Sequence, residues 1–161
     1  MNVFQVVLRF LTGFTPNENI NHSITGCEEL LSKAKHTIHI VAGDLDSQLF
    51  ENPTILDILQ TITTREKNPV NVKILFGPKT DSKTQKLFEM AQGNANIELI
   101  KLRERPTGHF IVVDGKHTRV EEFHEQSAPE RKAYMAYDTI FLGDKLEAEF
   151  DNLMSQVVNV S

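Results

Sequence analysis

The chain has 161 residues, of which 40% are hydrophobic and 24% are charged, and its formal net charge at pH 7 is −5. This length suits one domain with its own core, and the composition excludes a disordered chain. A protein that binds nucleic acid through the phosphates normally carries a basic surface, so the acidic balance weighs against that class without removing it. The single cysteine, Cys27, excludes an internal disulfide and favours a reducing compartment, the cytoplasm.

The first segment, Val3 to Phe14, is expected to form an amphipathic helix outside the main core. Its apolar residues recur at helical spacing: Phe4, Val7, Leu8 and Leu11. Arg9 interrupts the apolar run, which has no small-residue cleavage site after it and is shorter than the ~20 apolar residues of a transmembrane helix. We therefore expect neither a secretory signal nor a membrane span here, but a helix that packs on the core or docks a protein partner.

Strands and helices alternate through the middle of the chain. The apolar runs 37–42, 70–76 and 97–102 are expected strands. Three helices are expected beside them: one opened by a capping box at Thr25 and Glu28, one opened by Asn52-Pro53, and one over 81–92. Such alternation with short connections predicts a mostly parallel sheet with helices on its faces.

The pattern changes after residue 107. Two β-rich runs, 108–113 and 117–123, flank Asp114-Gly115, a hairpin signal because this pair tolerates positive φ. A further strand is expected near 133–137, followed by a long helix whose apolar residues keep helical spacing to Val157. The predicted fold is a single α/β domain over 1–161, with its core at about 23–157, a mixed and mostly parallel sheet, flanking helices, and a C-terminal β-hairpin plus long helix.

Three of the six histidines lie in this hairpin region, so the face that each one occupies matters. A two-residue loop at 114–115 would pair His109 with Val120 and Thr107 with Glu122. Because side chains alternate along a strand, one face is predicted to gather five candidate ligand-binding residues: Arg105, Thr107, His109, Glu122 and His124. The opposite face is predicted to carry His117, Arg119, Glu121 and Phe123.

The stretch from His109 to Lys116 resembles the core strand of the phospholipase D superfamily. That family's signature is a His, any residue, a Lys, four residues and an Asp, followed by Gly-Ser-any-Asn on the next strand. The order of the expected elements is similar over roughly residues 23 to 157. With Asp114 in register, Thr107 takes the position of the nucleophilic histidine and His109 that of the lysine. The Gly-Ser-any-Asn positions hold Glu121, Glu122, Phe123 and His124.

The resemblance implies a chemistry in which the histidine attacks phosphorus while the lysine and asparagine bind phosphoryl oxygens. Threonine is a poor nucleophile without an adjacent base. The carboxylate of Glu122 would repel an incoming phosphate, since two like charges ~4 Å apart interact by several kcal/mol at a protein surface. We therefore expect a non-catalytic binding, assembly or regulatory module that binds a small anionic or phosphate-bearing ligand and uses no cofactor. The resemblance also implies a homodimer with two hairpin faces brought together.

Two alternatives use the same face. His109 or His124, oriented by Glu122, would act as nucleophile or general base in a diverged phosphodiesterase or nuclease. The same three residues are types that Zn²⁺ accepts at a catalytic centre, which would give a metal-dependent hydrolase. Elsewhere, Asp44 and Asp46 follow an expected strand directly, where α/β proteins place ligand contacts, although aspartate is equally common in turns.

Overall fold

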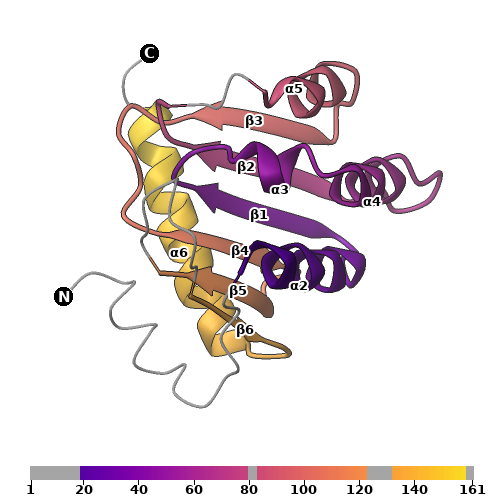
Figure 1. Ribbon diagram of the computed structural model, residues 1–161. Coiled ribbons are helices and arrows are strands. Elements are labelled where there is room, and N and C mark those ends of the chain that lie inside the picture. Colours follow the sequence, from indigo (N-terminus) through magenta and orange to yellow (C-terminus); the bar gives the residue numbers. More distant parts are fainter. Residues whose placement is uncertain (1–18, 80–82, 123–131, 159–161) are drawn as a thin grey trace.

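The structure is a computed structural model that describes residues 19–79, 83–122 and 132–158. Six strands form one sheet in the order β3-β2-β1-β4-β5-β6 (Figure 1). Their bounds are β1 Thr37–Ala42, β2 Asn71–Phe76, β3 Ile97–Lys101, β4 His109–Val113, β5 His117–Glu121 and β6 Ala133–Ala136. The expected helix at Val3 to Phe14 lies outside the described residues.

Helices cover both faces of the sheet. They are α2 Ile20–Ser32, α3 Ser47–Phe50, α4 Pro53–Thr63, α5 Gln85–Gln92 and α6 Ile140–Val158. Figure 1 shows α2, α3, α4 and α5 on one face and α6 alone across the other. Two apolar cores result, one under the four helices around Ile38, Ile40 and Ile74, the other under α6 around Phe110, Val120 and Phe150.

The predicted single α/β domain with a mixed sheet, a hairpin and a long final helix is confirmed. The sheet is less parallel than predicted: β1 pairs with β2 and β2 with β3 in parallel, while β4, β5 and β6 join in antiparallel fashion. The difference arises because β4 inserts beside β1, where Ile40 pairs with Ile111. The hairpin is thus the continuation of the sheet and not an appendage to it.

The first residues of α4 and α2 are set by asparagine side chains that cap the two helices. Asn52 caps α4 by accepting hydrogen bonds from Thr54 N and Ile55 N at 3.0 and 3.3 Å, as its position before Pro53 predicts. The predicted start at Thr25 is wrong, because the side chain of Asn19 already accepts a hydrogen bond from His22 N at 3.1 Å. Thr25 therefore lies inside α2. The short helix α3 was not expected.

The hairpin turn is where the predicted register fails. Asp114 and Gly115 both have positive φ, 52° and 67°, and Lys116 N donates to Val113 O at 3.2 Å. The strand pairing, however, resumes with Val113 opposite His117, so Lys116 is an extra residue and His109 lies opposite Glu121. The carbonyl of Lys116 accepts instead from Thr139 N at 2.8 Å, which holds it outside the ladder. One extra residue exchanges the faces of every side chain on β5.

Among the described helices, none combines the length and the apolarity that a membrane span requires.

Candidate functional site

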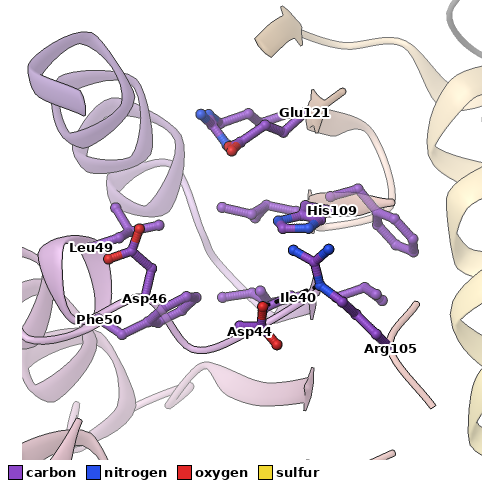
Figure 2. A pocket seen from close by; sticks show the side chains of 13 residues that line it. Ile40, Asp44, Asp46, Leu49, Phe50, Arg105, His109 and Glu121 are labelled. Carbon is purple, nitrogen blue, oxygen red and sulfur yellow. Dashed lines mark hydrogen bonds and ion pairs between the residues drawn. The ribbon is translucent and has the colours of Figure 1, made fainter. Parts of the chain in front are cut away.

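A small pocket lies at the carboxyl end of β1, between α3 and the start of the hairpin (Figure 2). Its volume is about 40 Å³, and Ile40, Leu49 and Phe50 form part of its apolar lining. Its polar lining consists of three carboxylates, two guanidinium groups and one imidazole: Asp44, Asp46, Glu121, Arg105, Arg119 and His109. Figure 2 shows the ring of His109 beside the guanidinium of Arg105, and the carboxylate of Asp46 next to Leu49 on the α3 side of the pocket. The pocket therefore brings together charges of both signs.

One cation of the pocket, Arg105, forms an ion pair with the carboxylate of Asp44. Arg105 Nε lies 3.1 Å from Asp44 Oδ2, and the side chain of Asp44 is only 9% exposed. The low exposure strengthens this attraction relative to a surface ion pair. The second oxygen, Asp44 Oδ1, has no hydrogen-bond partner among the described residues.

The second cation, Arg119 of β5, forms a buried ion pair. Arg119 Nη1 donates to Glu121 Oε2 at 2.6 Å, and Arg119 Nη2 donates to Ser23 Oγ of α2 at 3.0 Å. Both charged side chains are 5% exposed or less. Residues i and i+2 of a strand share a face, so this pairing is local to β5. A guanidinium buried to this degree needs such a partner, because an uncompensated charge in the interior is very costly.

Two glycines allow the backbone to come close to these side chains. A Cβ atom on Gly43 would lie 2.3 Å from His109 Nε2, and one on Gly77 would lie 2.1 Å from Gly43 O. Glycine is therefore required where β1 and β2 end, so that the imidazole can rest against the chain.

At the other end of the hairpin, Asp114 binds the start of β1. Its carboxylate accepts hydrogen bonds from the backbone N–H groups of Lys35, His36 and Thr37 at 2.8–2.9 Å. Burial alone would raise the pKa of Asp114, but these three donors outweigh it and lower the pKa below its ordinary value. Asp114 thus supports the sheet and does not face the pocket.

A larger cavity of about 430 Å³ lies on the α6 side of the sheet, under the connection 102–108. Val41, Arg105 and Phe110 contribute to both cavities. The exposed Thr107 lines only the larger one.

Three solved structures share this architecture at low sequence identity. TrmBL2, an archaeal chromatin protein with a novel mode of DNA binding, matches 96% of this chain with a TM-score of 0.60 and 14% identity. Nuc from Salmonella typhimurium, a phospholipase D family member, matches 82% with a TM-score of 0.60 and 14% identity. NucT from Helicobacter pylori matches 89% with a TM-score of 0.62 and 9% identity.

The chain has a phospholipase D-like fold. It spans 58% of the length of TrmBL2, 86% of Nuc and 97% of NucT. No protein-family model matches the sequence, and no curated protein matches it significantly. At identities this low the likeness establishes the fold alone.

Within this phospholipase D-like fold the predicted face is only partly assembled. Arg105 and His109 line the small pocket, as predicted, whereas Thr107 lines only the larger cavity. Glu122 does not join them: its side chain accepts a hydrogen bond from Tyr134 Oη at 3.1 Å, and Tyr134 packs against the core under α6. The prediction that Glu122 shares a face with His109 is wrong because of the extra residue at Lys116. His124 lies outside the described residues.

The same register shift separates the residues of the predicted metal centre. It also brings two residues into the pocket that were not predicted there. His109 and Glu122 lie on opposite faces of the sheet, so they cannot bind one ion together. Arg119 and Glu121, predicted to face away, line the pocket in their place. A sequence signal for them exists: two opposite charges at i and i+2 in a strand between two others must neutralise each other. Asp44 and Asp46, noted after β1, do line the pocket.

Proposed function

We propose that this phospholipase D-like chain is a non-catalytic binding or assembly module. The observation that carries the proposal is the charge pairing in the small pocket, where Asp44 neutralises Arg105 and Glu121 neutralises Arg119. A phosphodiester would have to displace these carboxylates to reach either guanidinium. With Asp46 included, the lining holds three carboxylates against two guanidinium groups, so it offers an anion little net attraction.

The small volume of the pocket and the residue at the nucleophile position support the same proposal. A cavity of about 40 Å³ is small beside the roughly 300–1,000 Å³ of typical ligand pockets. By the family resemblance the nucleophile position is Thr107, and this residue lines the larger cavity and not the small pocket. A threonine hydroxyl without an adjacent base does not attack phosphorus.

Three finer expectations remain proposals. The charge pairing disfavours a small anionic ligand in the small pocket, so that expectation rests on the family resemblance alone. The homodimer also rests on this resemblance. Location in the cytoplasm is supported by Cys27, a buried free thiol that suits a reducing compartment.

The test is a phosphodiesterase assay on the purified full chain, with bis(p-nitrophenyl) phosphate and with single- and double-stranded DNA, in Mg²⁺ and in EDTA. We expect no turnover above the rate without protein. Turnover by the wild type that disappears in His109→Ala would overturn the proposal.

A diverged phosphodiesterase is the second candidate, and one observation favours it. His109 and Glu121 are direct cross-strand partners, an imidazole and a carboxylate on one face of the sheet. In that mechanism His109 would act as general base and Glu121 would orient it. Turnover lost in both His109→Ala and Glu121→Gln would support this candidate.

Restoring the family motif provides a sharper version of the same test. We expect the double variant Thr107→His, His109→Lys to remain inactive, because Asp44 and Glu121 still occupy the pocket. Circular dichroism and thermal unfolding establish that the variant is folded. Measurable turnover would show that the site is less altered than we propose.

The likeness to a chromatin protein raises DNA as a ligand. We expect no shift of single- or double-stranded DNA in an electrophoretic assay at about 150 mM salt, because binding of the phosphates depends on a basic surface and the chain carries a net charge of −5. Retention that falls steeply as salt rises would instead indicate a DNA-binding module.

A further inference from the structure

The larger cavity has the properties of a small-molecule site, and a ligand bound there does not depend on the proposed loss of catalysis. Its volume of about 430 Å³ lies within the roughly 300–1,000 Å³ of typical ligand pockets. It opens between the connection 102–108 and the C-terminal half of α6. This is the face of the sheet opposite α2 to α5.

The floor of this cavity is apolar and is made by fixed parts of the fold. Val41 and Phe110 belong to central strands, Leu102 follows β3, and all three are 5% exposed or less. Leu153 and Val157 of α6 form the other side. Because the floor is part of the core under α6, the cavity is pre-formed and offers a rigid surface to an apolar ligand body.

The charges on the wall favour a cation. Four charged residues line the cavity: Arg103, Glu104, Arg105 and Glu149. Arg105 is already bound by Asp44, which leaves two carboxylates against one exposed guanidinium.

Glu149 is the carboxylate placed to bind a ligand. It is half-buried on α6, and among the described residues it forms no ion pair. Burial raises the pKa of Glu149 above its ordinary value, although a hydrogen bond from Asn152 opposes the change. A cation bound beside it would supply the missing charge, and the low exposure makes that attraction stronger than one at the surface.

We propose that this cavity binds a small organic amine, with its apolar body on Phe110, Leu153 and Val157 and its ammonium group on the carboxylate of Glu149. A neutral molecule of the same shape gains only the apolar contact. An anionic one is repelled by Glu149 and Glu104.

The test is a titration of the full chain with phenethylamine, with phenethyl alcohol and hydrocinnamate as neutral and anionic probes of similar shape. We expect the amine to bind, the alcohol to bind about tenfold more weakly or worse, and the acid not to bind. Methyl NMR should place the bound amine at Leu102 and Leu153. Equal binding of the alcohol, stronger binding of the acid, or unchanged methyl signals of these two leucines would overturn the proposal.

Two variants and a control localise the ammonium group. Glu149→Gln should weaken the amine by about tenfold or more, because it removes a hydrogen-bonded charge. Asp151→Asn, an exposed carboxylate on the same helix and outside the cavity, should leave the affinity unchanged. Thr107→Trp fills the cavity from an exposed connection and should abolish binding without changing thermal stability. Wild-type affinity in both Glu149→Gln and Thr107→Trp would show that the amine binds elsewhere.

Discussion

A single carboxylate, that of Asp114, joins the hairpin turn to the first strand of the sheet. It accepts three backbone N–H bonds that precede or open β1, and its own N–H donates to Thr37 O at 3.0 Å. In the family resemblance this aspartate is the retained residue of the motif. The structure gives it a supporting role that does not depend on catalysis.

We expect Asp114→Asn to lower the free energy of unfolding at pH 7 by about 1 kcal/mol, because the amide tolerates positive φ but has one acceptor oxygen for three donors. The pKa of Asp114 is lowered in the folded protein, so its contribution is complete above the unfolded value of about 4 and is lost as pH falls through the folded value. Urea denaturation should therefore show the stabilities of the two proteins converging as pH falls below about 4. Asp57→Asn, an exposed residue of α4, is the control and should match the wild type throughout.

The buried pair of Arg119 and Glu121 permits a test of a different kind. Arg119→Met leaves Glu121 as a buried, uncompensated charge and should cost about 3–5 kcal/mol in chemical denaturation. The double variant Arg119→Met, Glu121→Leu removes both charges and should be clearly more stable than the single one. Equal stability of the two variants would mean that the pair does not neutralise itself as the geometry indicates.

The residues of the pocket show what sequence reasoning reaches at this scale. Arg105 and His109 line one pocket, as predicted, whereas Thr107, which also precedes the turn, does not join them because alternation does not hold ahead of β4. Alternation from a two-residue turn predicts Glu122 and not Glu121 beside His109, and the extra residue Lys116 reverses which side chains of β5 lie on that face. The carbonyl of Lys116 accepts a hydrogen bond from Thr139 N, more than twenty positions further on. The sequence around the turn alone does not reveal such a distant contact.

At the scale of elements, α6 lies directly on the hairpin turn. A Cβ atom on Gly143 would be 1.8 Å from Gly115 O, so two glycines far apart in the sequence meet where the helix crosses the turn. We expect Gly143→Ala to lower thermal stability by about 1–3 kcal/mol through overpacking, although alanine alone favours a helix by about 1 kcal/mol.

Gly93, at the end of α5, is the matched control for that substitution. A Cβ atom there would have its nearest neighbour, Glu89 O, at 3.8 Å. Gly93→Ala should be neutral or stabilising by about 0.4–1 kcal/mol in the same melting experiment. A similar loss in both variants would assign the effect to glycine removal in general and not to the contact with Gly115.

Elements with strong local signals were predicted well, and the others were not. The alternating apolar runs gave all six strands, and Asn52-Pro53 gave the start of α4. The helix α3 has four residues, too few for periodicity to reveal, and it depends on Asp46 accepting from Gln48 N at 2.8 Å. The predicted start of the α5 helix at Asp81 lies outside the described residues.

At the scale of the whole molecule, the expected assembly is a two-fold dimer. Sedimentation velocity on the 18.3-kDa chain should give about twice this mass at micromolar concentration, because the family resemblance implies a homodimer. A monomer that persists as the concentration rises would contradict the dimer, but not the proposed loss of catalysis.

The place of β4 between β1 and β5 has a consequence for synthesis. When a ribosome has released the chain as far as Leu102, the nascent polypeptide contains β1, β2 and β3, yet one edge of β1 has no partner. Exposed strand edges are templates for wrong pairing, and distant partners are slow to arrive. The last third of the protein therefore shields the first third from aggregation, and we expect truncation after Leu102 to yield an insoluble fragment.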